Sequence, residues 1–107
     1  MLIVNRLLVE FIGTFIFLGV IMATLKDGAI AALEVGLALA AVIFFGGKIS
    51  GGHFNPAVSI MMLLRRQPDY GAVECVSYII AQILGGICAY FFITRSLALK
   101  NKGRSRK

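Results

Sequence analysis

Three long hydrophobic runs dominate the pattern of apolar and polar positions along the chain. They cover residues 7–25, 29–47 and 71–94, and each is long enough to cross a bilayer core once as a helix, which takes about 20 residues. A secretory signal peptide is the alternative for the first run, but the run is long, contains Glu10 and has no clear cleavage site after it. The pattern therefore predicts an all-α membrane protein with three transmembrane helices.

The segment between the second and third runs, residues 48–66, has a different pattern. A glycine-rich stretch comes first, and an apolar stretch from Pro56 to Leu64 follows it. A helix of nine or ten residues is about 15 Å long, which is half the thickness of the hydrocarbon core. We expect a re-entrant loop and half-helix that enter and leave the membrane on the same side. An ordinary cytosolic loop with an amphipathic helix is the alternative that composition alone leaves open.

The residues around Asn55 have the pattern of a helix start. Asn55 suits the N-cap, and Pro56 suits the first helical position, where its missing N–H leaves no bond unmade. Near the membrane midplane, the partial positive charge of this helix terminus would oppose cations. The backbone of the preceding loop, residues 50–54, is stable at that depth only where protein buries it or water reaches it. Its carbonyl groups, with the Asn55 amide as a donor, would form a hydrogen-bonding route for small neutral molecules.

Composition agrees with a membrane protein and limits the other classes. Hydrophobic residues make up 59% of the 107 residues and charged residues 15%, and the mean hydropathy is +0.89. A soluble domain is nearer half apolar and a quarter charged, so these values exclude a disordered chain, a nucleic-acid-binding domain and most soluble enzymes. The net charge of +6 comes largely from the end of the chain. We therefore divide the chain into a membrane domain, residues 1–94, and a basic C-terminal tail that flanks the membrane, residues 95–107.

Two further features concern helix packing. Small residues recur every four positions in the second and third runs, a spacing that lets membrane helices pack closely. The two sets are Ala32, Gly36 and Ala40, and Ala81, Gly85 and Ala89. Cys75 and Cys88 both lie in the third run, so we expect two buried free thiols rather than a disulfide or a metal pair.

The residues that enzymes use do not occur in a suitable arrangement. His53 is the only histidine, so a metal site or an acid–base pair would lack partners, and its expected role is a hydrogen bond within the loop. Gly51 and Gly52 are not followed by the Lys-Ser or Lys-Thr of a phosphate-binding loop. We expect no enzymatic activity, no metal and no cofactor.

Three motifs, in this order along the chain, resemble the N-terminal half of the aquaporin and aquaglyceroporin (major intrinsic protein) family. Residues 10–15, Glu-Phe-Ile-Gly-Thr-Phe, resemble the first-helix motif of that family. Residues 49–59, Ile-Ser-Gly-Gly-His-Phe-Asn-Pro-Ala-Val-Ser, resemble its first Asn-Pro-Ala loop, and residues 78–86 resemble its third-helix motif. The resemblance implies an integral multi-pass membrane protein in which three transmembrane helices and one re-entrant half-helix are equivalent to one inverted repeat of the aquaporin fold.

The resemblance also implies which residues line a pore. Asn55 would be the donor that faces the pore, while Pro56 and Ala57 would hold the half-helix. Val35 falls at the constriction position of the second helix. The residues that would supply carbonyl groups along the pore are Gly51, Gly52, His53 and Phe54.

Three carboxylates lie within the apolar runs, where ionisable groups suggest a function by default. Glu10, together with Gln82, matches family positions that brace the loops by hydrogen bonds. Glu34 has no such counterpart; it would pair with a basic residue of another copy, or stay protonated at a helix contact. Glu74 lies near a helix end, and we expect it to reach the lipid headgroups.

The sequence departs from the family pattern because it contains three spans and one Asn-Pro-Ala motif, whereas the family has six spans and two motifs. In the family a constriction arginine follows the second motif, but here Val58 follows the only one. We expect a passive channel for water and small neutral solutes such as glycerol, formed when half-channel chains pair antiparallel. Three spans would leave four basic residues on one side of the membrane and seven on the other, which predicts mixed or inverted insertion.

Two other functions remain open from the sequence. The first is an inert or regulatory half-channel that pairs with a complementary half-channel chain or a full-length channel subunit. The second is a small membrane protein that binds lipid through its basic tail. The expected partners are therefore the lipid bilayer, a second copy in an antiparallel homodimer or higher oligomer, or a complementary half-channel, and not nucleic acid.

Overall fold

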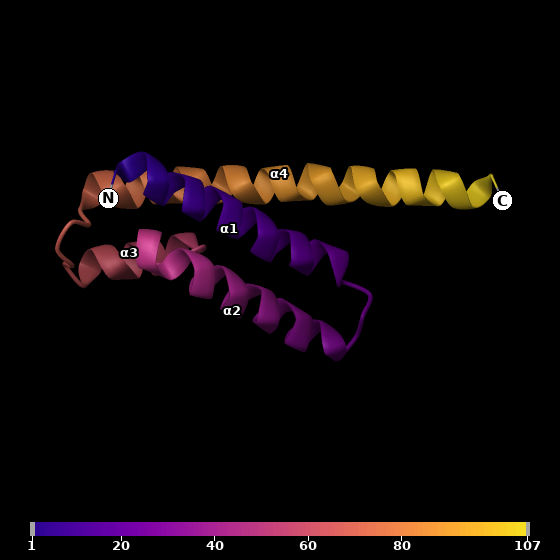
Figure 1. Ribbon diagram of the computed structural model, residues 1–107, viewed down its shortest axis with the longest axis horizontal. Coiled ribbons are helices and arrows are strands. Elements are labelled where there is room, and N and C mark those ends of the chain that lie inside the picture. The colour runs from indigo at the N-terminus through magenta and orange to yellow at the C-terminus, as the bar shows by residue number, and fades with distance from the viewer. Residues whose placement is uncertain (1, 107) are drawn as a thin grey trace.

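The computed structural model describes residues 2–106, which form four helices (Figure 1). These are α1 (Ile3–Ala23), α2 (Ile30–Ser50), α3 (Pro56–Leu64) and α4 (Ala72–Ser105). Helices α1, α2 and α4 are each long and apolar enough to cross a membrane. The fold is all-α, with three spanning helices and one half-helix, and this confirms the fold class predicted from the hydrophobic pattern.

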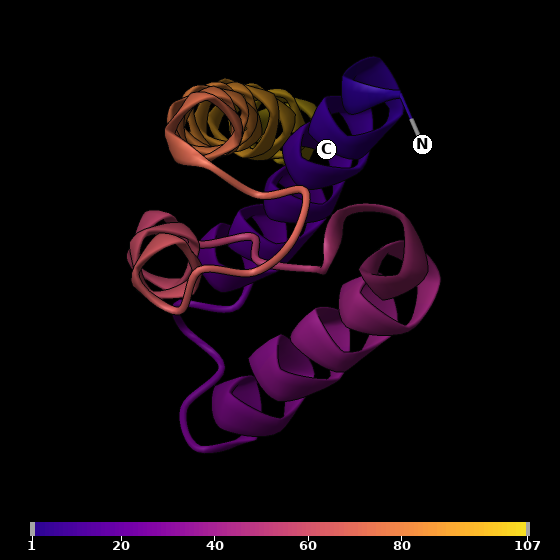
Figure 2. The same ribbon diagram turned by 90° about the vertical axis from the view of Figure 1, so that its left-hand side faces the viewer.

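The path of the chain turns back on itself between α2 and α3. Helix α1 runs away from the N-terminus and α2 returns alongside it (Figures 1 and 2). Residues 51–55 then lead back toward the middle of the bundle, and α3 runs outward to the end at which α2 finished. The nine residues of α3 are about 14 Å long, too short to cross the membrane. The re-entrant half-helix predicted from the sequence is therefore confirmed.

Small residues hold α4 close to α1. The residues of this set are Ala81, Gly85 and Ala89, and all three are buried. A Cβ at Gly85 would lie 2.5 Å from the Phe11 carbonyl oxygen and 3.2 Å from the Phe15 amide nitrogen, so the two backbones approach within a distance that only glycine permits. The close packing predicted for the third run is confirmed.

The corresponding set in α2 does not pack within this chain. Its members, Ala32, Gly36 and Ala40, are exposed, and no atom lies within 4 Å of a Cβ built at Gly36. Helix α2 instead packs on α1 near its C-terminal end, where Gly46 and Val42 are buried. A Cβ at Gly46 would lie 2.5 Å from the Val9 side chain. The helices splay apart from there, so the prediction for this set is wrong for contacts inside the chain.

The structure also corrects one prediction about the thiols. Both cysteines are free, but only Cys75 is buried, and Cys88 is exposed. Cys88 precedes Ala89, which faces α1, and neighbouring residues of a helix point about 100° apart. The thiol of Cys88 is therefore turned away from the contact with α1.

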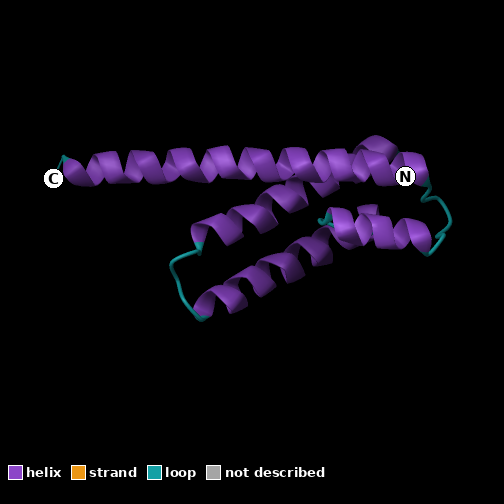
Figure 3. Cartoon of the chain, turned by 180° about the vertical axis from the view of Figure 1, so that it is seen from behind, coloured by secondary structure: helices purple, strands orange, loops and turns teal. Residues whose placement is uncertain are grey.

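Helices α2 and α4 extend past the C-terminal ends of their predicted spans. Helix α2 continues through Lys48 to Ser50, and α4 continues through most of the basic tail to Ser105 (Figure 3). Charged residues end a hydrophobic run, but they do not necessarily end a helix. Lys and Arg, like Ala and Leu, are strong helix formers. The predicted boundary at residue 95 lies inside α4, and Lys107 lies outside the described residues.

Candidate functional site

The carboxylate of Glu10 lies at the centre of the site. Glu10 is in α1, its side chain is completely buried, and it accepts hydrogen bonds from three other parts of the chain. The donors are the Ser50 hydroxyl (2.6 Å), the backbone N–H groups of His53 (3.1 Å) and Phe54 (2.8 Å), and the Gln82 amide (2.8 Å). One carboxylate therefore connects α1 to the end of α2, to the re-entrant loop and to α4. The structure brings Glu10 and Gln82 together at the loop.

Ser59 is a second point at which the loop is connected to the helices. It is completely buried in α3, and its hydroxyl lies 2.8 Å from Nδ1 of His53 and accepts a hydrogen bond from the Gln82 amide at 2.9 Å. The Tyr70 hydroxyl donates to the Ser59 carbonyl at 2.9 Å. Burial raises the pKa of the Tyr70 hydroxyl, which keeps it protonated as a donor. The Tyr78 hydroxyl donates to the carbonyl of Ser50.

The loop backbone adopts conformations that favour glycine. Gly51 has φ of 94° and Gly52 has φ of 66°, both in the left-handed region, and Gly51 ends α2 as its C-cap. Phe54 has φ of 53°, which is strained for a residue with a side chain. Two contacts hold Phe54 in this conformation: its N–H donates to Glu10, and its buried ring lies between α1 and α2.

The carbonyl groups of the loop have no hydrogen-bond partners among the described residues. Among the hydrogen bonds described for residues 2–106, none reaches a carbonyl oxygen between Gly51 and Phe54. The side chains of His53 and Phe54 are themselves buried, so these two residues expose only backbone groups at the loop. Such acceptors at the depth of a half-helix need water or another polar molecule as a partner.

Asn55 begins the half-helix in the predicted way. Its side-chain oxygen accepts a hydrogen bond from the N–H of Ala57 at 2.8 Å, and Pro56 occupies the first turn. The side-chain NH₂ group of Asn55 has no partner within residues 2–106, and the residue is exposed. The N-terminus of α3, with its partial positive charge, therefore opens toward the surface of the chain together with a free amide donor.

Asn55 and Pro56 line a mostly apolar groove of about 620 Å³. Residues of α1 and α4 form its walls, among them Thr14 and Gln82. Thr14 Oγ1 and Gln82 Oε1 are both buried and have no hydrogen-bond partner in the described part of the chain. Two residues of the groove wall thus have unsatisfied polar atoms, and both atoms are buried beneath its surface.

Val35, the remaining predicted pore residue, stands apart from this cluster. It lies fifteen residues before the end of α2, or about 22 Å along the helix axis. Its side chain is partly exposed on the portion of α2 nearest the turn that joins α1 to α2. The structure thus brings the loop, Glu10 and Gln82 together but leaves Val35 toward the other end of the bundle.

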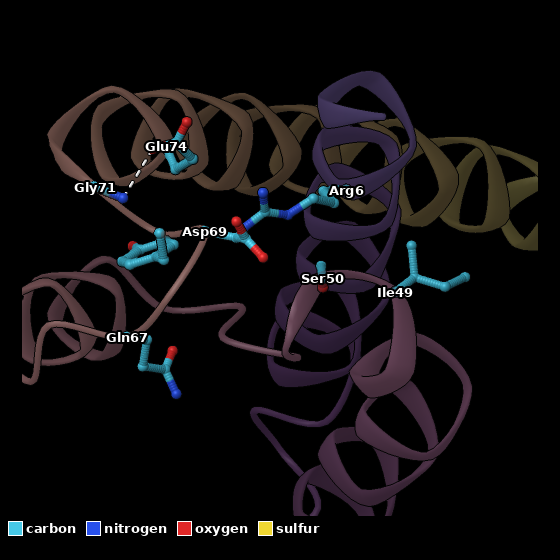
Figure 4. Close-up of a pocket in the computed structure, with 8 residues that line it drawn as sticks. Arg6, Ile49, Ser50, Gln67, Asp69, Gly71 and Glu74 are labelled. Carbon is cyan, nitrogen blue, oxygen red and sulfur yellow. Dashed lines mark hydrogen bonds between the residues drawn. The ribbon is translucent and has the colours of Figure 1, made fainter. Parts of the chain in front are cut away.

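An open cleft of about 840 Å³ lies at the end of the bundle where α2 and α3 finish (Figure 4). The residues around it are Arg6, Ile49, Ser50, Gln67, Asp69, Tyr70, Gly71 and Glu74. Arg6 Nε donates to the Tyr78 hydroxyl at 3.0 Å, and the Glu74 carboxylate accepts from the N–H of Gly71 at 2.8 Å. Glu74 therefore caps the start of α4, a role that the sequence analysis did not predict for it.

Comparisons with known proteins agree with this geometry. Residues 26–105 match the family model described as Major intrinsic protein. The chain is 45% identical over 89 residues to Glycerol uptake facilitator protein-like 6 of Lactiplantibacillus plantarum, which covers 79% of this chain and 40% of that protein. It is 38% identical over 95 residues to Aquaporin Z of Photorhabdus laumondii, with the same coverage. It is 33% identical over 94 residues to Nodulin-26 of Glycine max, which covers 79% of this chain and 34% of that protein.

The chain spans about two fifths, or less, of the length of the curated relatives it matches. No solved structure matches it. The match covers all of α2, the re-entrant loop, α3 and α4, which include the Asn-Pro-Ala motif and Gln82. The chain is thus an integral, multi-pass membrane protein, and it belongs to the major intrinsic protein family, as its three motifs predicted.

Proposed function

We propose that this chain forms one half of a passive channel for water and small neutral solutes such as glycerol, and that a second copy, inserted antiparallel, forms the other half. The observation that carries the proposal is the half-helix α3, which starts at the exposed Asn55 after four backbone carbonyl groups without partners. The names of the relatives, a glycerol uptake facilitator and an aquaporin, support these solutes.

The chemistry of the loop suits neutral hydrogen-bonding molecules. A water molecule or an alcohol can donate to the carbonyl groups of Gly51 to Phe54 and accept from the free amide of Asn55, so it exchanges its water partners for protein partners along the way. The positive end of the α3 dipole would meet a cation entering from either side, which opposes its passage. The mostly apolar walls of the groove give a charged solute little compensation for lost hydration.

The groove beside Asn55 supports pairing with a second copy. Thr14 Oγ1 and Gln82 Oε1 are buried acceptors without partners, and an unsatisfied polar group in a membrane interior costs about 1–3 kcal/mol. An antiparallel two-fold axis would place the same groove of both copies face to face, as in an isologous interface. The two α3 helices would then meet at the midplane.

Osmotic shrinkage of liposomes that contain only this chain tests the proposal. Stopped-flow light scattering should show water flow well above that of empty vesicles, with a low temperature dependence. Asn55→Leu should reduce this flow by about tenfold or more, because it removes the only free side-chain donor at the start of α3. Asn55→Asp loses the NH₂ donor but keeps an oxygen that can cap the helix. This variant therefore separates the role of Asn55 in permeation from its role in folding.

Asn101→Leu is the matched control, since Asn101 lies in the exposed final turns of α4, away from the loop. It should conduct water like the unaltered chain. Flow no faster than in empty vesicles, measured with protein whose helical content is intact, would overturn self-pairing. Full conductance of both Asn55 variants would overturn the role assigned to the half-helix.

A further inference from the structure

The last third of α4 extends beyond the rest of the bundle. Helix α4 has 34 residues and is about 51 Å long, whereas α1 and α2 have 21 residues each. Its C-terminal portion projects past the turn between α1 and α2 with no other helix beside it (Figures 1 and 3). We call residues 95–106 the basic collar.

The basic collar carries charge of one sign only. Its basic residues are Arg95, Lys100, Lys102, Arg104 and Arg106, and all are exposed. The last acidic residue before it is Glu74, in the first turn of α4 at the opposite end of the bundle. No acidic side chain on the same helix is therefore close enough to neutralise the collar.

The charges lie on two opposite faces of the helix. Arg95, Lys102 and Arg106 follow an i, i+7, i+11 spacing and share one face, while Lys100 and Arg104 are four residues apart on the other. A helix that lies flat on a membrane carries its basic residues on a single face. The arrangement here suits a helix that passes upright through a layer of negative groups and meets them on every side.

The position of the basic collar matches the headgroup layer. The apolar part of α4 ends at Thr94, so a bilayer core of about 30 Å, which 20 residues span, would end near Arg95. The polar layer beyond it is roughly 5–8 Å deep, which places Arg95 to Lys100 within it. Lys102 and Arg104 lie just outside, within a Debye length of about 8 Å from the surface, and Arg106 lies at about that distance.

We propose that the basic collar binds the phosphate groups of anionic phospholipids, independently of any conduction by the loop. Arg95 and Lys100 contact the phosphates within the headgroup layer, and the outer basic residues attract further anionic lipid to the same leaflet. A lipid surface is the partner that fits, because the helix emerges directly from the bilayer and its first basic residue stands at the boundary. A nucleic acid would need to compete with that surface for the same side chains.

Electron spin resonance of the full chain in phosphatidylcholine bilayers tests this, with trace spin-labelled phosphatidylglycerol or phosphatidylcholine. The spectra give the relative association of the two lipids with the protein. The unaltered chain should prefer phosphatidylglycerol, and 0.5 M NaCl should weaken the preference. The triple variant Arg95→Gln, Lys100→Gln and Lys102→Gln should reduce the preference by about threefold or more.

The matched control neutralises three exposed basic residues at the other end of the bundle, Lys48→Gln, Arg65→Gln and Arg66→Gln. It should retain most of the preference. Gln is a good helix former, so circular dichroism should show an unchanged helical content in both variants. Equal losses in the two variants, or no preference in the unaltered chain, would overturn the proposal. Displacement of phosphatidylglycerol by a short oligonucleotide would also overturn it, in favour of nucleic-acid binding.

Discussion

The ring of Phe54 occupies the space beside Gly13 that any larger side chain would need. The ring atoms Cδ1 and Cζ lie 2.6 and 2.7 Å from the position of a Cβ on Gly13, and Cζ also lies 3.2 Å from that position on Gly46. The ring of the loop residue is thus inserted between a glycine of α1 and a glycine of α2. This contact holds the strained backbone of Phe54, and with it the start of the half-helix.

We predict that Gly13→Ala destabilises the protein by about 1–3 kcal/mol, because the added methyl group displaces the Phe54 ring. Gly36→Ala is the control, since no atom lies within 4 Å of a Cβ at that position of α2. It should leave stability unchanged or raise it by up to about 1 kcal/mol through helix propensity. Thermal unfolding in detergent measures both variants, and equal stability of the two would contradict the role given to the ring.

Replacing the central carboxylate should be more costly. Glu10→Gln would place an NH₂ group among donors that now bond to two carboxylate oxygens, at a site with no exposure to water. We expect a loss of about 2–5 kcal/mol, together with faster proteolysis of the loop. Glu74→Gln is the control, because it makes the same chemical change at a carboxylate that accepts one hydrogen bond, at the cap of α4. A glutamine oxygen can accept the same bond, so this variant should melt like the unaltered protein. Near-native melting of the Glu10 variant would rule out its bracing role.

We predict that the size of the side chain at Val35 sets which solutes pass. Val35→Phe narrows the path, so we predict that glycerol flow falls at least tenfold while water flow falls by less than half. Leu37→Phe is the control, since Leu37 is exposed and lies about 200° around the same helix from Val35. It also introduces a phenylalanine, and it should change neither flow. Stopped-flow measurements with water and glycerol gradients separate the two variants. An unchanged ratio of the two flows would remove Val35 from the pore.

Antiparallel pairing requires copies of both orientations. The basic residues Lys48, Arg65 and Arg66 lie at one end of the bundle, while Lys26 and the basic collar lie at the other. We predict that single cysteines introduced at Leu2 or Ser105 are each labelled from both sides of the membrane. Neutralising three residues of the basic collar should shift the population toward a cytoplasmic N-terminus. Labelling from one side only would exclude the antiparallel dimer.

Local sequence signals predicted the half-helix but not the network that holds it. Asn55 and Pro56 act within one turn, so their types and spacing were sufficient to predict the start of α3. The roles of Ser59 and Tyr78 were not predicted, because a serine in an apolar helix or a tyrosine near a helix end is common. Their partners lie 6 to 72 residues away. The bond between Glu10 and Gln82 spans 72 residues. The family resemblance singled out both residues as loop braces but did not predict that they bond to each other.

Hydropathy located the spans but not the helix ends, for a related reason. The hydrophobic pattern records where a chain prefers lipid, whereas helix ends depend on backbone propensity and capping. Gly51, with its left-handed backbone, ends α2 three residues after the apolar run, and α4 meets no comparable stop before Ser105. Exposure also depended on the partner helix, since Cys88 and Ala89 are adjacent in sequence but face opposite environments.

The hydrogen bonds of Glu10 have a consequence for the order of events during synthesis. The carboxylate is made with the first span, but its partners in the loop follow about 40 residues later and Gln82 follows 72 residues later. A growing chain therefore presents a carboxylate to the bilayer before any of its partners has left the ribosome, at a cost of a few kcal/mol. The first span gains its full stability only when the third has been inserted, so α4 completes the assembly of the helices.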